Sequence, residues 1–157
     1  MRTAPGSAGG RSPWAYDAAV TVHAGHLRFS TEGNGDVIDI TAGVRSVVAQ
    51  AGVQSGIASV FVPGSTAAVT TMEHEPGGVH DLRETLERLV PREGSYEHNR
   101  LNNDTNSHAH IRAAIVGPSE TLPVRDGRLE LGTWQQVVLV DFDDRPRQRT
   151  VVVQVLG

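Results

Sequence analysis

The chain has 157 residues, of which 38% are hydrophobic and 20% are charged, and its formal net charge is −4. This length and balance predict one folded domain with a real core, and they exclude a chain that is disordered throughout. The acidic balance argues against a nucleic-acid partner, and the absence of cysteine excludes disulfides, thiolate nucleophiles and sulfur ligands for a metal.

We expect a cytoplasmic protein with no membrane partner. No apolar run in the sequence is long enough to span a bilayer, and the N-terminus lacks the charged start and apolar core of a signal peptide. Residues 1–13 are rich in Gly, Ser, Ala and Pro, which predicts a disordered tail. The folded domain is therefore expected over residues 14–157.

The first part of the chain predicts strands followed by a helix. Apolar and polar residues roughly alternate from Trp14 to Thr31, which predicts two strands that meet at Ala24-Gly25. Asp39 or Thr41 is expected to cap a helix, and Gly52 is expected to end it.

Two short strands and a helix are predicted next. Residues 56–62 and 66–72 are rich in apolar and β-branched side chains, and we expect them to pair through the connection Pro63-Gly64-Ser65. The leucine spacing over residues 81–90 predicts a helix, and Pro91 is expected to end it.

The last part predicts a short helix and then strands only. Asn106 or Ser107 is expected to cap the helix, which ends at Gly117-Pro118. Asp126-Gly127 is typical of a hairpin turn. The predicted strands cover residues 119–124, 128–131, 134–142 and 149–156. Strands separated by about three helices predict a single α+β domain on a mixed, mainly antiparallel sheet.

The segment from His98 to His110 carries the strongest chemical signal. The segment is polar, with few apolar side chains to pack, and it contains three imidazoles, including His108, and the carboxylate of Asp104. These are the groups that a metal site or a proton-transfer site requires. On a helix, His108 and His110 would point roughly 200° apart. We then expect His110 to enter the site, because it precedes the apolar Ile111. The alternative is that these rings cap the helix or bond to backbone.

Further candidates lie elsewhere in the chain. Glu73 ends an apolar strand, so its carboxylate is either paired, coordinated or simply exposed at the end of the strand. Ser65 and Thr66 follow Pro-Gly in a tight turn that is able to hold a phosphate or a carboxylate of a substrate. Trp134 and Gln135 combine a large ring with an amide. We expect them to form the floor of a ligand pocket, or else to belong to the core.

Several short motifs stand in the order found in one known family. They are Glu73, Tyr96-Glu-His98, His110-Ile111, Gly117-Pro-Ser119, Leu122-Pro-Val124, Gly127-Arg-Leu129, Leu131-Gly-Thr-Trp-Gln135, Arg149 and Gly157. On these residues the chain resembles the YjbQ family from about Trp14 to its C-terminus. The Gly-Thr-Trp-Gln run and the two histidine positions are fairly specific as a set.

The resemblance implies a compact α+β protein that assembles as a homotrimer with a polar cleft. It also implies a weak thiamine-phosphate synthase activity, because members of the family are described as secondary thiamine-phosphate synthases. One departure stands out: the family commonly has His-Thr-Thr/Ser-Ala where this chain has Gly64-Ser-Thr-Ala67. The first imidazole of the usual site is therefore missing, and His108, or His74 beside Glu73, is the expected substitute.

The leading hypothesis is a transferase that acts on a small phosphorylated or heterocyclic substrate. By resemblance, the reaction joins a pyrimidine pyrophosphate to a thiazole phosphate and releases pyrophosphate. Such a reaction requires neutralisation of the leaving group, by Mg²⁺ or by arginine. Arg100 or Arg112, beside the histidines, is expected to pair with the phosphate.

The histidines have two expected roles in this hypothesis. His98 and His110 would transfer protons or bind a divalent metal, either Zn²⁺ or Mg²⁺, with His108 as a further ligand, and Glu73 or Asp104 would orient them. The second hypothesis is a protein that binds a metabolite or a metal without turnover. A third is that the histidines form an interface between subunits.

Overall fold

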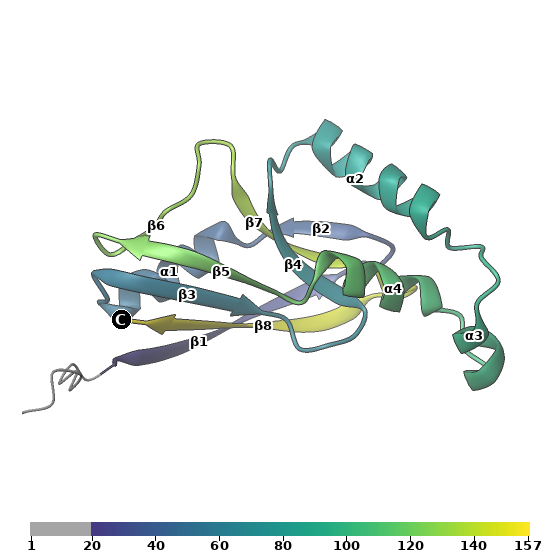
Figure 1. Cartoon of the computed structure of the whole chain (residues 1–157), viewed down its shortest axis with the longest axis horizontal. Coiled ribbons are helices and arrows are strands. Elements are labelled where there is room, and N and C mark those ends of the chain that lie inside the picture. Colours follow the sequence, from purple (N-terminus) through teal and green to yellow (C-terminus); the bar gives the residue numbers. More distant parts are fainter. Residues whose placement is uncertain (1–19) are drawn as a thin grey trace, which may run out of the picture.

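The computed structural model, which describes residues 20–157, contains two antiparallel sheets and four helices in its described part (Figure 1). One sheet has the strand order β1-β8-β3-β5-β6 and the other has the order β2-β7-β4. The strands are β1 (Val22–Thr31), β2 (Asp36–Asp39), β3 (Ser55–Phe61), β4 (Ala67–Met72), β5 (Ser119–Arg125), β6 (Arg128–Leu129), β7 (Gln136–Asp141) and β8 (Arg147–Leu156). The helices are α1 (Thr41–Ala51), α2 (Pro76–Leu89), α3 (Glu97–Asn102) and α4 (Ser107–Val116). The tail predicted over residues 1–13 lies outside the described residues.

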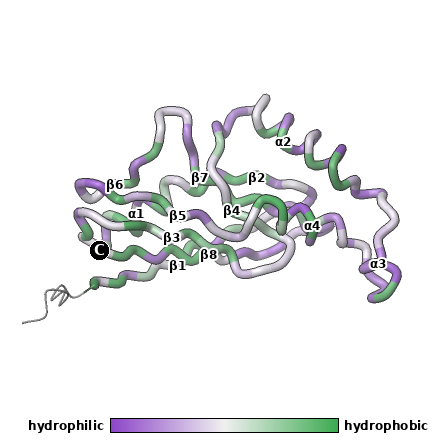
Figure 2. Tube along the Cα trace, viewed as in Figure 1, coloured by the Kyte–Doolittle hydropathy of each residue, from purple (hydrophilic) through white to green (hydrophobic). Residues whose placement is uncertain are grey.

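The main core lies between the two sheets. Buried side chains from β3, β5 and β8 meet those of β4 and β7, and α1 adds Val44, Val47 and Val48. A second cluster lies on the other face of the three-stranded sheet, where Leu86 of α2 and Ala113 of α4 pack. Strand β7 is therefore covered on both faces and is an almost continuous apolar run. Figure 2 shows apolar residues along the strands of both sheets, whereas the region of α3 is largely hydrophilic.

The predicted break at Ala24-Gly25 is wrong, because β1 is one strand that pairs with β8 along its whole length, from Val22↔Leu156 to Thr31↔Arg147. Gly25 does not turn the chain. It gives room to α1, since a Cβ there would lie 2.7 Å from Cγ2 of Val47. A glycine in a strand interior often marks such a close approach rather than a turn.

The predicted pairing of residues 56–62 with residues 66–72 is also wrong. Strand β3 pairs with β5 and β8, whereas β4 pairs with β7 in the other sheet. The connection through Pro63 and Gly64 carries the chain from one sheet to the other. Apolar side chains on both strands face the shared core in either arrangement, so the hydrophobic pattern does not distinguish one sheet from two.

The helix boundaries follow from their caps. Asp39 accepts the N–H of Thr41 through Oδ1 at 2.8 Å, and α1 ends at Gly52 with φ 67°. Helix α2 begins five residues before the predicted position, at Pro76, because the side chain of Glu75 accepts the N–H groups of Gly77 and Gly78. None of the helices in residues 20–157 is long and apolar enough to cross a membrane.

The segment before α4 departs from the prediction as well. Residues 97–102 form the short helix α3 rather than a loop, and Asn103 then takes a left-handed conformation with φ 51°. Helix α4 begins at Ser107, as predicted, and its last N–H bond comes from Gly117. The turn at Asp126-Gly127 is also as predicted, since both residues have positive φ, as a two-residue hairpin requires. The two consecutive helices α3 and α4 bring their polar side chains to one end of the sheets.

Candidate functional site

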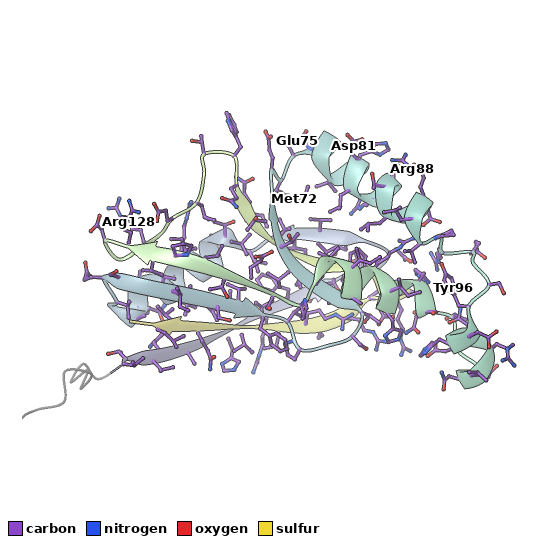
Figure 3. The ribbon with its side chains drawn as sticks, viewed as in Figure 1. Met72, Glu75, Asp81, Arg88, Tyr96 and Arg128 are labelled. Carbon is purple, nitrogen blue, oxygen red and sulfur yellow. The ribbon has the colours of Figure 1, made fainter. Side chains whose placement is uncertain are left out.

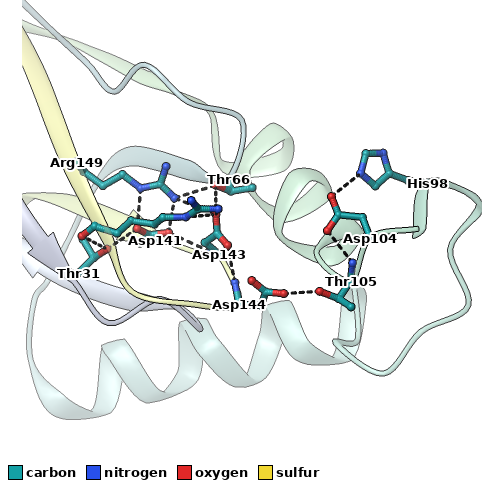
Figure 4. Close-up of polar contacts among 10 residues, drawn as sticks. Thr31, Thr66, His98, Asp104, Thr105, Asp141, Asp143, Asp144 and Arg149 are labelled. Carbon is teal, nitrogen blue, oxygen red and sulfur yellow. Dashed lines mark hydrogen bonds and ion pairs between the residues drawn. The ribbon is translucent and has the colours of Figure 1, made fainter. Parts of the chain in front are cut away.

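A polar pocket of about 730 Å³ lies between the start of β4, the loop that joins β7 to β8, and the N-terminal end of α4. One wall comes from the two sheets and the other from the segment around α3 and α4 (Figure 4). Six of the residues that line it are Ser65, Thr66, Asp104, His110, Asp143 and Arg149.

The sheet wall is held by a buried ion pair between Asp141 and Arg149. Nε of Arg149 donates to Oδ2 of Asp141 at 2.7 Å, and Nη2 donates to Oδ1 at 2.7 Å. The Asp141 side chain is fully buried, and that of Arg149 is 11% exposed. Thr31 also donates its hydroxyl to Oδ2 of Asp141 at 2.5 Å. This carboxylate is therefore buried with its charge paired and both of its oxygens occupied.

Thr66 links this pair to a second carboxylate. Its hydroxyl donates to Oδ2 of Asp143 at 3.0 Å and accepts from Nη2 of Arg149 at 2.8 Å. Arg147 donates to the same Asp143 oxygen through Nε at 2.8 Å. Two carboxylates thus face two guanidinium groups, so the wall is rigid and close to neutral in charge.

The helix wall carries the histidines. The ring centroids of His98 and His110 lie 4.9 Å apart with planes tilted by 54°. Oδ2 of Asp104 lies 3.9 Å from Nε2 of His98, and both side chains are close to half-exposed. The structure therefore brings together His98, Asp104 and His110 from the predicted set.

Two polar atoms on this wall make no hydrogen bond within the described part of the chain. They are Nε2 of His98 and Oδ1 of Asn106, and both are buried. On the other side of the His98 ring, Nδ1 lies 3.3 Å from Nδ2 of Asn102, an amide nitrogen that also donates to the carbonyl of His98. Nδ1 then accepts, so the proton of a neutral ring is on Nε2. Asn106 lines the pocket, whereas His98 does not.

His108 does not join the other two histidines. It is buried on the opposite face of α4, at 1% exposure, as the helical spacing of two residues predicts. Burial lowers the pKa of His108, and the positive charges of Arg112 and Arg92 lower it further, against the opposing effect of Asp144 and Glu87. This imidazole is a neutral core residue at neutral pH, and it does not reach the place left open at Gly64.

The lowered pKa of His108 predicts a loss of stability in acid. Below about pH 6.5 the unfolded chain protonates this ring while the folded protein resists protonation, so the free energy of unfolding falls as the pH drops toward the folded pKa. We expect urea unfolding between pH 8 and pH 5 to show this fall, and His108→Gln to reduce it. The exposed His80 on α2 supplies the control, His80→Gln. Equal pH slopes in the two variants would contradict the assignment.

Three of the predicted site residues, Glu73, Trp134 and Gln135, lie at the end of the three-stranded sheet that is away from the pocket. Thr66 precedes β4 and Glu73 follows it, so the two residues are at opposite ends of the strand. Gln135 lies near Glu73's end, since its Nε2 donates to Thr71 at 2.9 Å, and Trp134 is 70% exposed. Figure 3 shows Met72 and Glu75 at this end, away from the α3 region where Tyr96 lies. Glu73, Trp134 and Gln135 therefore do not line the pocket.

The arginines that were predicted to bind phosphate are engaged elsewhere. Arg100 pairs with Glu97 on the surface. Arg112 is buried, pairs with Glu87 and donates to the carbonyl of Val90 through Nε at 3.0 Å. Neither lines the pocket.

The predicted three-histidine metal site does not form. In residues 20–157, no group of three or more His, Cys, Asp or Glu side chains is placed to hold a metal ion. Zinc normally takes at least three protein ligands in a tight shell. With His108 buried on the other face of α4, the residues present do not fit such a site.

The residues of the sheet wall were not identified from the sequence. Asp141 ends an apolar strand, as Glu73 does. A carboxylate at such a position is either paired, coordinated or exposed, and the same reasoning would have made Asp141 a candidate. Arg145, Arg147 and Arg149 alternate along the next segment, which is typical of side chains that share one face of a strand. This alternation was the available signal for an arginine-lined pocket.

Comparison with known proteins gives a consistent family. The family model described as "UPF0047 protein YjbQ-like" matches residues 25–157. A UPF0047 protein of Methanothermobacter thermautotrophicus is 38% identical over 136 residues, which cover 87% of this chain and 93% of the relative. A UPF0047 protein of Archaeoglobus fulgidus is 38% identical over 130 residues, 83% of this chain and 98% of the relative.

Solved structures agree with the fold. A YbjQ-like protein of unknown function from Sulfolobus solfataricus superposes with a TM-score of 0.84 at 34% identity, over 88% of this chain and 99% of the other. A hypothetical protein from Aeropyrum pernix gives a TM-score of 0.79 at 38% identity, over 85% and 98% of the two chains. The predicted α+β fold with a mainly antiparallel arrangement is thereby confirmed, as is the family resemblance.

Proposed function

From the premise that this chain belongs to the YjbQ-like UPF0047 family, whose similar members are described as being of unknown function, we propose that it is an enzyme that transfers protons to or from a small molecule bound in the polar pocket. The observation that carries the proposal is the contact between the His98 and His110 rings, at 4.9 Å, beside a pocket of about 730 Å³. A pocket of this size is in the range that small-molecule ligands occupy.

The roles of the residues follow from their positions. His110 lines the pocket and is the group that meets the substrate. His98 stands behind it, with its Nε2 proton directed into the space that it shares with Asp104, 3.9 Å away. A nearby carboxylate stabilises a protonated imidazole, so Asp104 would support the charged form that arises during proton transfer.

The substrate class that we propose is a small phosphorylated or heterocyclic molecule. Arg145, Arg147 and Arg149 line the pocket, and guanidinium N–H groups are suited to phosphate oxygens even where, as in Arg147 and Arg149, the charge is already paired with an aspartate. The specific reaction to test is thiamine-phosphate synthesis, in which the bond from a pyrimidine methylene to pyrophosphate breaks, a bond to the thiazole nitrogen forms, and a proton from His110 would pass to the departing pyrophosphate. The arginine side chains would then bind the departing pyrophosphate.

We propose Mg²⁺ rather than Zn²⁺ as the divalent partner. Mg²⁺ is usually bound by one or two carboxylates together with phosphate oxygens of the substrate, and Asp104 and Asp144 line the pocket. Affinity for pyrophosphate should therefore rise in the presence of Mg²⁺, as measured by calorimetry with and without the ion. The same rise in an Asp104→Asn, Asp144→Asn double variant would contradict this assignment.

The function is tested by a ligand screen on the intact protein. We expect thiamine precursors and other small phosphorylated compounds to raise the thermal unfolding midpoint, and at least one pair of them to react, as detected by pyrophosphate release. His80→Asn, on the exposed face of α2, should behave as the wild type in both assays. Absence of both a shift and a product across the screen would reject the proposal.

The alternative is a protein that binds its ligand without turnover. One observation favours it: the 3.9 Å between Asp104 and His98 is longer than a hydrogen bond, so the acid–base group is not assembled in this structure. A large thermal shift without any product would support this alternative.

We also propose that the chain assembles as a homotrimer. Within residues 20–157, no helix covers the outer face of the five-stranded sheet, which exposes Val22 (59%), Ile57 (43%) and Phe61 (40%). Exposed apolar side chains on neighbouring strands are typical of a subunit interface. Light scattering after size exclusion should give three times the 16.8 kDa of the chain. The cytoplasmic location stays a prediction.

A further inference from the structure

One nitrogen of the Arg149 guanidinium remains open to the pocket. Nε and Nη2 are engaged by Asp141 and Thr66, whereas Nη1 makes no hydrogen bond within residues 20–157. Nη1 lies beside Gly64, where a Cβ atom would be 3.2 Å away from it. Apart from the chain neighbours of Gly64, no other heavy atom of the described residues lies within 4 Å of that position. The glycine therefore leaves a free approach to Nη1.

The direction of this donor is fixed before any ligand arrives. The Arg149 side chain is 11% exposed, and its bidentate bond to the fully buried Asp141 holds the guanidinium plane. A donor that is already held in place loses little entropy on binding, and a guanidinium bonds to oxyanions more strongly than a neutral donor does.

We propose that Nη1 of Arg149, reached over Gly64, binds an oxyanion group of the ligand, either a phosphate or a carboxylate. The exposed Ser65 follows Gly64 and adds a hydroxyl at the same edge of the pocket, and Arg145 adds a second positive charge. This inference rests on the proposed function in one respect, because it places the ligand in the same pocket. It also gives Gly64 a role. At the position where the family commonly has an imidazole, the absence of a side chain leaves the guanidinium of Arg149 accessible.

The negative charges in the pocket restrict where the oxyanion can bind. The charge of Asp143 is paired with Arg147, whereas within residues 20–157 no arginine forms an ion pair with Asp144, although Arg145 is near enough to act on it electrostatically. The hydroxyl of Thr105, on the helix wall, donates to Asp144 and lowers its pKa, so this carboxylate is charged at neutral pH. In the absence of Mg²⁺, an oxyanion is therefore favoured at the Gly64 side of the pocket and disfavoured beside Asp144.

The first test is calorimetric titration at low ionic strength with pyrophosphate and, separately, with malonate. We expect wild-type protein to bind at least one of them, and the better probe identifies the phosphate or the carboxylate class. Gly64→Ala places a methyl group in front of Nη1 and should weaken binding about tenfold, the loss of one charge-assisted hydrogen bond. Gly64 has a positive φ of 147°, so the matched control is Gly117→Ala, where φ is also positive, at 100°, and no heavy atom lies within 4 Å of the added Cβ.

The second test does not depend on a variant. In the ¹⁵N spectrum of wild-type protein, saturation with the better probe should shift the Arg149 Nη1 signals. Binding by Gly64→Ala equal to the wild type, unmoved Nη1 signals, or no binding of either probe would each overturn the inference. His110→Asn separates this inference from the proposed function, since that variant should lose turnover and still bind pyrophosphate within about twofold.

Discussion

Replacement of His110 by asparagine is expected to lower the turnover of the pocket's reaction by about 10²–10⁴-fold, the usual contribution of a positioned general acid or base. The ring lines the pocket and contacts His98, and no hydrogen bond from it to the described residues would be lost. The fold should therefore survive, with a thermal midpoint close to that of the wild type. The measurement is the steady-state rate with the substrates found in the ligand screen.

The His98→Asn variant tests whether His98 and His110 act as a pair or as two separate groups. If His98 acts through His110, the double variant should be no slower than the slower single variant, because groups that act as a unit are not additive. His80→Asn on α2 is the matched control, since this ring is exposed and lies outside the pocket. A His110→Asn rate within twofold of the wild type would exclude the proposed role.

Replacement of Arg149 by methionine is expected to give the largest loss of stability. It leaves Asp141, which is 0% exposed, without its positive partner, and breaking a buried pair from one side costs about 3–5 kcal/mol. The cost should appear as a lower urea midpoint in equilibrium unfolding. The Asp141→Asn, Arg149→Met double variant should recover part of it, because no uncompensated charge then remains in the interior.

A matched surface pair gives the control for this experiment. Arg100 and Glu97 also form an arginine–carboxylate contact, but their side chains are 67% and 76% exposed. Exposed pairs contribute about 0–1 kcal/mol, so Arg100→Met should change the midpoint little. Equal losses in Arg149→Met and Arg100→Met would mean that the buried pair does not stabilise the sheet wall.

Local signals predicted the local structure well. Gly52 and Asp126-Gly127 ended or turned the chain where expected, because each requires a backbone conformation that glycine or a small polar residue adopts readily. The same reasoning failed at Gly25, where the absence of a side chain serves packing against Val47. A glycine alone does not distinguish these two uses; only the neighbouring element does.

The candidate site likewise has one part that local signals predicted and another part that they did not. His98, Asp104 and His110 were predicted together because they are close in sequence, and the turn after α3 brings them together in space. The sheet wall depends on contacts between distant residues, such as Thr31 with Asp141, 110 positions apart. Such pairing follows from the order of strands in the two sheets, which the hydrophobic pattern did not determine.

Glu73, Trp134 and Gln135 were grouped with the histidines for their chemistry and their shared family motif. In the structure, β4 places Glu73 at the end away from Thr66, and Gln135 bonds to Thr71 near the same end. Residue type and order along the chain indicate which side chains are chemically useful. They do not indicate which end of a strand each one occupies.

The most direct test of the account is a histidine-detected ¹⁵N spectrum of the protein, recorded with and without the best ligand from the screen. The chain has seven histidines, so the residues outside the pocket serve as internal controls. We predict that the ring signals of His98 and His110 shift together on saturation, while those of the buried His108 and the exposed His80 stay in place. A ligand that shifts neither His98 nor His110 would contradict the claim that these two rings act together at the pocket.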